Sequence, residues 1–301
     1  MSNLVTADKA ATPGGKVLPP ALLKALSGVT EIGSLPEVTT KIVRLIEDQR
    51  STARQIQDVV RTDPALAARI LKIVNSAFYG LPAQIASLER AIVMLGLSAV
   101  RNLALAASLS RLFRADQICP EFSTRDLWRH SVAVAVAAKL LGGAGRSAQG
   151  DEAFVAGLMH DMGLLVAQQL FRAKVQEVAE RCLRAPEVFC AAEEQVIGAD
   201  HQTFGLALAT KWKFPPSLRN VIGYHHEPSS LQPEFQKVAA LVYLADSLCC
   251  QAQIGFWLTA QTQEFPEWME KLIAVTSADL ARVGEQLPER LAEAEQIFAV
   301  E

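Results

Sequence analysis

The chain has 301 residues, half of them apolar, and its 29 Lys and Arg against 32 Asp and Glu give a formal net charge of -3. The length suits one large or two medium domains, and the lack of a basic cluster excludes sequence-independent binding to nucleic acid. The longest uncharged apolar stretch, residues 91–100, is too short to cross a membrane, and the first residues lack the pattern of a signal peptide.

The first part of the chain contains closely spaced helix-start signals. Residues 1–18 are rich in Ala, Thr, Gly and Pro without apolar periodicity, which is typical of a disordered lead. Beyond them, Ser34-Leu-Pro-Glu37 is a capping box with a proline in the first helical turn. Ser51 and the Asp63-Pro64 pair are expected to begin the next two helices. Residues 19–115 are therefore predicted to form an N-terminal lobe of about five short helices.

The second part, residues 116–255, carries longer apolar runs. Its first helix is expected over residues 125–141, although Val132-Ala-Val-Ala-Val136 alternates like a strand. The length of this run and its alanines favour a helix. Further helices are expected at about 151–170, 174–183 and 201–212, then up to residue 224, and over 236–250.

The last part, residues 256–301, is predicted to be a C-terminal helical extension that Pro288 interrupts. No segment of the chain gives a convincing strand signal. The predicted fold class is therefore all-α, a multi-helical bundle with two lobes.

The His160-Asp161 doublet poses the main functional question, because an ionised carboxylate within an apolar helix is costly unless it is paired. Histidines and a second acid on other helices could supply the partners. The candidate metal ligands are His130, His160, Asp161, His201, His225, His226 and Asp246. Imidazoles and carboxylates gathered from several helices suit one or two divalent ions of iron, manganese, zinc or nickel better than calcium.

Each candidate also has an ordinary structural interpretation. A lone histidine such as His130 or His201 on an apolar helix is more often a hydrogen-bonded core residue than a ligand. The His225-His226 pair could cap the C-terminus of its helix, and Asp246 could pair with an arginine. Asp126, one turn before His130, is expected to cap its helix rather than to bind an ion. The combined set, more than any single residue, indicates a metal.

Several motifs occur in the order that characterises one known family. They are Ser34-Leu-Pro-Glu37, Arg61-Thr-Asp-Pro-Ala-Leu66, Leu71-Lys-Ile-Val-Asn-Ser-Ala77, Ser87-Leu-Glu-Arg-Ala-Ile92, Gly157-Leu-Met-His-Asp-Met-Gly163 and His201-Gln-Thr-Phe-Gly205. Over roughly residues 19–250 the chain resembles the HDOD domain. The resemblance implies an all-helical output module of bacterial signalling proteins, related to HD phosphohydrolases and HD-GYP cyclic-di-GMP phosphodiesterases but without established catalysis.

The resemblance also implies roles for the candidate ligands. The HD pattern falls on His130, His160, Asp161 and Asp246, and the HD-GYP pattern adds His201, His225 and His226. Asp161 would then be shared by two ions. However, the lysine that follows the His-Asp-x-Gly motif of HD-GYP proteins is Leu164 here, and no Gly-Tyr-Pro follows His226. Hydrolysis of cyclic-di-GMP is therefore not expected.

Two functions stay open from the sequence. The first is a regulatory module that acts by binding other signalling proteins, with the N-terminal lobe as the partner surface and the metal as a structural or vestigial centre. The alternative is a metal-dependent phosphohydrolase of nucleotides or phosphoesters, although no Lys or Arg cluster accompanies the candidate ligands. Access would separate the two, because a substrate needs an open cleft at the metal. The five irregularly spaced cysteines favour a reducing compartment, and we expect a cytoplasmic location.

Overall fold

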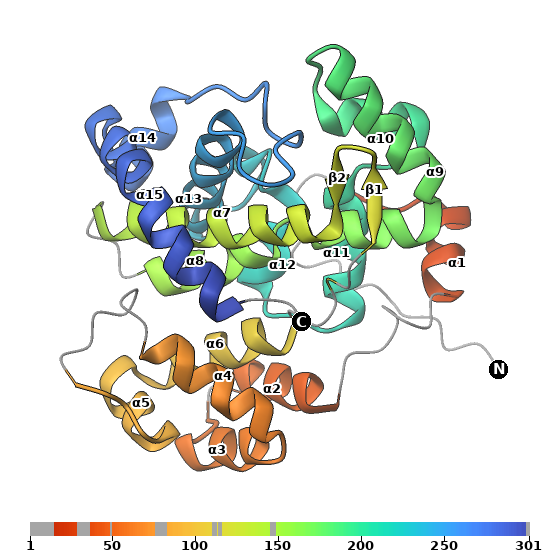
Figure 1. Ribbon diagram of the computed structural model, residues 1–301. Coiled ribbons are helices and arrows are strands. Elements are labelled where there is room, and N and C mark those ends of the chain that lie inside the picture. The colour runs from red at the N-terminus through yellow and green to blue at the C-terminus, as the bar shows by residue number, and fades with distance from the viewer. Residues whose placement is uncertain are drawn as a thin grey trace.

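The computed structural model describes residues 15–28, 37–48, 50–75, 83–109, 113, 116–144 and 149–298. Helices dominate these residues, and their one sheet is a two-stranded hairpin, so the predicted all-α class is confirmed. Figure 1 shows two helical lobes, with α2–α6 below and α7–α15 above. Most of the predicted capping box at 34–37, and the predicted disordered lead up to residue 14, lie outside the described residues.

The helices of the N-terminal lobe are α2 (Glu37–Glu47), α3 (Ala53–Arg61), α4 (Pro64–Val74), α5 (Leu88–Leu95) and α6 (Leu97–Leu109). The second lobe begins with the antiparallel pair β1 (Gln117–Cys119) and β2 (Phe122–Ser123). Its helices are α7 (Thr124–Ala144), α8 (Gly150–Met159), α9 (Met162–Arg184), α10 (Phe189–Val196), α11 (His201–Lys211), α12 (Pro216–Tyr224), α13 (Pro233–Gln251), α14 (Glu267–Ile273) and α15 (Ser277–Phe298). A 3-10 turn, Pro228–Ser230, joins α12 to α13.

Local chemistry explains where the helices of the N-terminal lobe begin. Asp63 caps α4 by accepting a hydrogen bond from the Leu66 N–H, with Pro64 in the first turn, as the sequence predicts. The predicted cap of α3 is wrong by one residue, because Thr52 forms the capping box. Ser51 instead donates to the Leu45 carbonyl at 2.6 Å and accepts from Arg101 at 2.5 Å. Ser51 therefore ties the end of α2 to α6.

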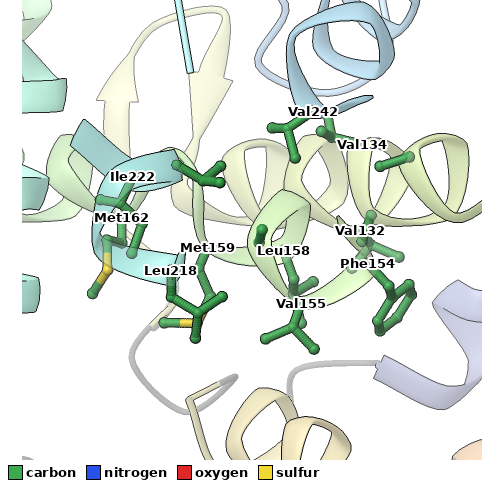
Figure 2. Packing of buried hydrophobic residues seen from close by; sticks show 14 of the residues in the cluster. Val132, Val134, Phe154, Val155, Leu158, Met159, Met162, Leu218, Ile222 and Val242 are labelled. Carbon is green, nitrogen blue, oxygen red and sulfur yellow. The ribbon is translucent and has the colours of Figure 1, made fainter. Parts of the chain in front are cut away.

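The core of the second lobe is built around α7, which packs against α8, α13 and α15. Residues 132–138 are at most 1% exposed, so the alternating Val132–Val136 segment lies in a helix that is buried on every side and shows no amphipathic period. Figure 2 shows Val132 and Val134 of α7 packed with Phe154 of α8 and Val242 of α13. The N-terminal lobe meets this core through α6, which lies against α8.

The helix predicted over 151–170 is interrupted at His160 and Asp161, which form the junction between α8 and α9. The ring Nδ1 of His160 donates to the Gly157 carbonyl at 2.7 Å. Beyond the junction, Gly163 lies directly against the His201 carbonyl of α11. The approach to α11, a tertiary contact, therefore sets the path of the chain here. By length and composition the stretch Gly150–Arg184 could cross a membrane, but 83% of its apolar window is buried, as in a core helix.

Three other segments differ from the prediction. The β1–β2 hairpin was not expected, because strands of three and two residues are too short to show alternation. Pro288 lies within α15 and does not interrupt it. The segment before α1 (Pro20–Gly28) is anchored by Leu18, which is only 4% exposed, and by an ion pair of Lys16 with Asp200, so the predicted disorder does not extend to residue 18. Helix α1 packs on α9 of the second lobe, as Figure 1 shows.

Candidate metal centre

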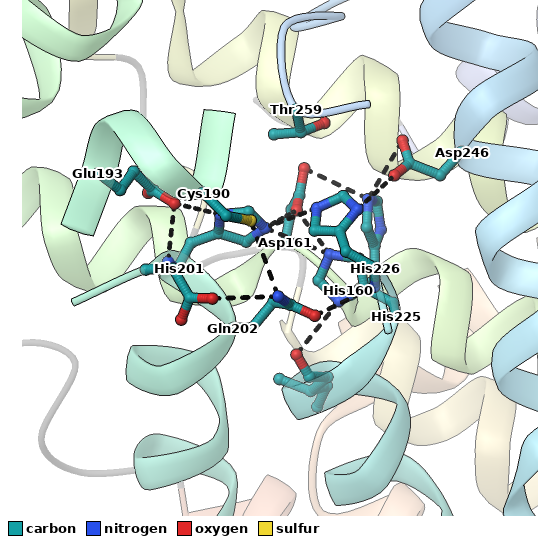
Figure 3. A network of polar contacts seen from close by, with 12 residues as sticks. His160, Asp161, Cys190, Glu193, His201, Gln202, His225, His226, Asp246 and Thr259 are labelled. Atoms are coloured by element: carbon teal, nitrogen blue, oxygen red, sulfur yellow. Dashed lines mark hydrogen bonds and ion pairs between the residues drawn. The ribbon is translucent and has the colours of Figure 1, made fainter. Parts of the chain in front are cut away.

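The structure brings together all seven predicted ligands from several elements of the second lobe. Figure 3 labels all of them except His130. They come from α7, the α8–α9 junction, α11, the C-terminal end of α12, and α13. Their side chains are completely buried, except for His226, whose side chain is 7% exposed. The converging groups are His130, His160, Asp161, His201, His225, His226 and Asp246.

The first group of ligands surrounds Asp246. The Nε2 atom of His130 lies 3.0 Å from Asp246 Oδ1, and Nε2 of His160 lies 3.9 Å from the same oxygen. His160 Nε2 is also 3.3 Å from Asp161 Oδ2. Two imidazoles and a carboxylate therefore face one point, with a second carboxylate at its edge.

The second group surrounds the other oxygen of Asp161. Asp161 Oδ1 is 3.3 Å from His201 Nε2 and 3.5 Å from His225 Nε2. The Nε2 atom of His201 is also 3.2 Å from that of His225 and 3.1 Å from that of His226. Asp161 thus faces the first group with one oxygen and the second group with the other.

The donor atoms fit a bound cation. Both oxygens of Asp161, Oδ2 of Asp246 and Nε2 of His160 are buried without a hydrogen-bond partner. Such orphaned groups are rare in folded proteins because burying an unpaired charge is costly. Within the described part of the chain, the ion pairs recorded for Asp161 and Asp246 involve imidazoles alone. Mixed imidazole and carboxylate donors suit a divalent transition metal.

A surrounding set of hydrogen bonds orients the five rings. The Nδ1 atoms of His130, His160 and His225 face backbone carbonyl oxygens, those of Ile254, Gly157 and Ile222, at 3.1, 2.7 and 3.2 Å. Nδ1 of His201 faces the Glu193 carboxylate at 2.6 Å, and Nδ1 of His226 contacts the Gln263 side-chain amide. Partners on Nδ1 leave Nε2 directed at the centre, as in histidine ligands of metals.

Burial and charge set the protonation of the metal-free cluster. Burial lowers the pKa of His225 to about 4 and lowers the pKa of His226 well below its usual value. Burial alone would raise the pKa of Asp161, but the neighbouring imidazoles, His160 first, hold it well below its usual range. Burial alone would lower the pKa of His201, but Glu193 and Asp161 raise it to about 9. At neutral pH the centre therefore presents an ionised Asp161 carboxylate and neutral His225 and His226 rings, and metal binding would displace a proton from His201.

Three polar residues around the centre were missed in the sequence. Glu193 contacts His201, Gln202 accepts the His226 N–H at 3.0 Å, and Gln263 contacts the His226 ring. Glu193 and Glu194 are adjacent glutamates, and nothing in the sequence distinguishes the buried one. Asp126, in contrast, has a capping role near that predicted, because it accepts from the N–H and hydroxyl of Ser123 from within the first turn of α7.

The segment after α13 closes the centre on one side. Gly255 has a φ of +64°, and a Cβ there would lie 2.3 Å from the Asp126 carbonyl oxygen, so only glycine fits against the turn that carries His130. Phe256, completely buried, follows it and donates its N–H to the same carbonyl at 3.0 Å. The region predicted as a C-terminal extension thus supplies part of the wall of the candidate site.

The N-terminal segment is fastened beside the centre by Lys16. Its ammonium lies 3.1 Å from Asp200 and 3.5 Å from Glu227, residues that adjoin His201 and His226 in the sequence. Burial alone would raise the pKa of Asp200, but Lys16, His201 and Thr203 lower it to about 2. Asp200 also caps α11 through the Thr203 N–H at 2.8 Å.

A Lys16→Met substitution is expected to reduce the free energy of unfolding at pH 7 by about 1–3 kcal/mol, because it leaves the buried Asp200 carboxylate without its cation. The folded-state pKa of Asp200 is depressed from 3.8 to about 2, so its stabilising effect is present above pH 4 and is lost as the pH falls toward 2. Denaturant unfolding at pH 7 and at a pH near 2 measures the difference in free energy of unfolding between the variant and the parent. Lys271→Met, at an exposed ion pair, is the control, and equal effects of both variants would contradict the prediction.

Comparisons with known sequences agree with the motifs. The sequence model of the HDOD domain matches residues 32–228. Over 227 residues the chain is 26% identical to an uncharacterized protein of Treponema pallidum strain Nichols. The aligned region covers 72% of this chain and 42% of that protein. The chain therefore spans less than half the length of this relative.

Solved structures share the fold. An HDOD domain protein of unknown function from Geobacter sulfurreducens superposes with a TM-score of 0.77 at 24% identity, over 92% of this chain and 98% of that chain. A protein of Shewanella amazonensis SB2B, provisionally named a phosphohydrolase, superposes with a TM-score of 0.70 at 21% identity, over 95% of this chain and 100% of that chain. A protein from Marinobacter aquaeolei VT8, provisionally named a signal transduction protein, superposes with a TM-score of 0.73 at 22% identity, over 92% of this chain and 64% of that chain. The match to the family extends over more than half of the chain, from α2 to α12, and the chain therefore belongs to the HDOD domain family.

Proposed function

We propose that this chain is a signal-transduction regulatory module whose second lobe is held together by a buried centre of one or two ions of iron, manganese, zinc or nickel. His130, His160 and Asp246 would hold one ion, and His201, His225 and His226 the other, with Asp161 between them. The proposal rests on the orphaned oxygens of Asp161 and Asp246, which face five buried imidazoles and no recorded lysine or arginine among the described residues.

The burial of the centre supports a regulatory role over a catalytic one. Six of the candidate ligands are completely buried and His226 is 7% exposed, whereas a catalytic metal keeps one position open to substrate. Glu193, Gln202 and Gln263 orient the ligands from outside, and the segment around Gly255 packs over His130. The seven groups would hold the ions, and the three outer side chains orient the ligand residues.

A metal-dependent phosphohydrolase is the second candidate. The two oxygens of Asp161 face separate ligand groups, as expected for a carboxylate shared by two ions. Two proteins of similar fold bear provisional phosphohydrolase names, one of them with the term metal-dependent. Bound ions would supply stabilisation of negative charge on a phosphoryl oxygen.

A phosphoester screen separates these candidates, and chelation tests the metal centre that both of them require. Removal of metal by a chelator is expected to lower the melting temperature by roughly 5–10 °C, since a ligand present at about 100 times its Kd stabilises by about 2.7 kcal/mol. We expect the loaded protein not to hydrolyse bis(p-nitrophenyl) phosphate or cyclic dinucleotides. Turnover that disappears in an Asp161→Asn variant would establish the second candidate instead.

The N-terminal lobe is the proposed surface for a signalling partner. It meets the second lobe mainly through α6 and α8, and it contributes none of the candidate ligands. In this proposal, loading of the centre reaches this lobe through α8, whose last residue, Met159, directly precedes His160. We place the module in the cytoplasm, which its five free cysteines support. Binding of a candidate signalling protein to the full chain and to a variant with substitutions in α5 tests the surface.

A further inference from the structure

Glu193 is a buried acid outside the set of candidate ligands. It lies on α10, a helix that contributes none of the seven groups, and its side chain is only 1% exposed. Its Oε1 atom has no hydrogen-bond partner. A carboxylate so deeply buried destabilises the fold unless its interactions compensate for the lost hydration.

Among the described residues, both hydrogen bonds to the Glu193 carboxylate come from His201. Its Oε2 accepts from the backbone N–H at 2.9 Å and from the ring Nδ1 at 2.6 Å. A neutral ring that donates from Nδ1 carries its lone pair on Nε2, and this neutral form is the one that binds a metal. That Nε2 atom lies 3.3 Å from Asp161 Oδ1. The carboxylate therefore fixes both the orientation of the ring and its tautomer.

This partner differs in kind from those of the other four rings. Three of them face backbone carbonyl oxygens and the fourth contacts an amide, whereas His201 faces a carboxylate. A carboxylate partner makes an imidazole a stronger donor and adds negative charge behind it. Glu193 thus adds a second negative charge to a half that otherwise shares the Asp161 carboxylate with the other ion.

We propose that Glu193 is a positioning residue that sets the affinity of the His201, His225 and His226 half of the centre for its ion. The inference rests on the proposed metal centre, and Glu193 acts through the His201 ring without touching the ion. Cys190, Glu193 and His201 also lie close enough together to hold an ion of their own. However, the hydrogen bond of 2.6 Å from His201 Nδ1 to the Glu193 carboxylate already uses the two atoms that such an ion would need.

The test is a zinc titration of chelator-stripped protein in competition with a chromophoric chelator. Glu193→Gln keeps the shape and an acceptor oxygen but removes the charge. It is expected to weaken the binding of one zinc ion by about 10–100-fold. This ion is identified as the one that is lost in a His225→Ala variant. Glu193→Leu, which also removes the acceptor, is expected to weaken its binding further. Glu194→Gln makes the same charge change on the exposed side of α10 and should bind zinc as the parent does.

Nitrogen-15 NMR of the imidazole rings gives a readout that a purely structural role would not move. In the zinc-loaded parent, His201 should carry its proton on Nδ1, and Glu193→Leu should lose or broaden this signal. Parent-like zinc affinity in Glu193→Gln would overturn the role of Glu193, as would loss of one zinc equivalent in Cys190→Ser. A parent that binds no zinc would instead overturn the proposed metal centre itself.

Discussion

An Asp161→Asn variant is expected to lose roughly 100-fold or more in affinity for transition metal, more than the loss usually caused by changing a residue outside the ligand shell. The reason is that Asp161 faces both ligand groups, with Oδ2 toward His160 and Oδ1 toward His201 and His225. The amide keeps the shape of the side chain but has neither the charge nor the second acceptor oxygen.

The stability difference between this variant and the parent should depend on metal. With metal present it should unfold at a lower temperature than the parent, because it lacks the binding free energy. In excess chelator the difference from the parent should be smaller, because the binding free energy no longer contributes and only the imidazoles that lower the pKa of Asp161 still stabilise its charge. Thermal unfolding with and without chelator measures both. Asp151→Asn, at a partly exposed ion pair with Lys139, is the control. A stability difference of the same size with and without chelator would contradict the role of Asp161 in metal binding.

A Gly163→Ala variant is expected to lose about 3 kcal/mol or more of its free energy of unfolding. A Cβ at this position would lie 1.8 Å from the His201 carbonyl oxygen and 2.7 Å from the Gly205 nitrogen. These are backbone atoms of α11, so α9 and α11 must separate. The separation would also move the His201 ring away from Asp161, and we expect metal affinity to fall together with stability.

Denaturant unfolding and metal titration of the same preparations check this prediction. Gly143→Ala, on α7, is the matched control, because a Cβ there meets nothing within 4 Å. The control should be neutral or slightly stabilising, by up to about 1 kcal/mol. Equal stability of the two variants would show that α9 and α11 are not in the close contact described.

The all-α class and many helix boundaries followed from local signals. The Asp63-Pro64 pair begins α4 as predicted because capping is chemistry within one turn. The junction at His160 and Asp161 could not be predicted in the same way, because the apolar pattern continues across it and the contact of Gly163 with α11 is tertiary. The helical state of Val132–Val136 was recoverable only from its length and alanines, since burial on all sides removes the period.

The candidate site was predictable to the extent that its chemistry is rare in the sequence. The chain has five histidines, and all five rings face one another across the centre. The charge of Asp161 within an apolar run indicated that a partner was needed, and this reasoning did not depend on the family. The outer partners were not predictable, because Glu193 differs from Glu194 only in which side of α10 is buried. Gln263 lies in a segment that meets the centre through tertiary packing after α13.

The metal content of the purified chain, measured by elemental analysis at neutral pH, tests the central claim most directly. We predict one to two equivalents of iron, manganese, zinc or nickel, retained through gel filtration and absent from Asp161→Asn. A parent that contains no transition metal, takes up none on titration and melts at the same temperature with and without chelator would contradict the account.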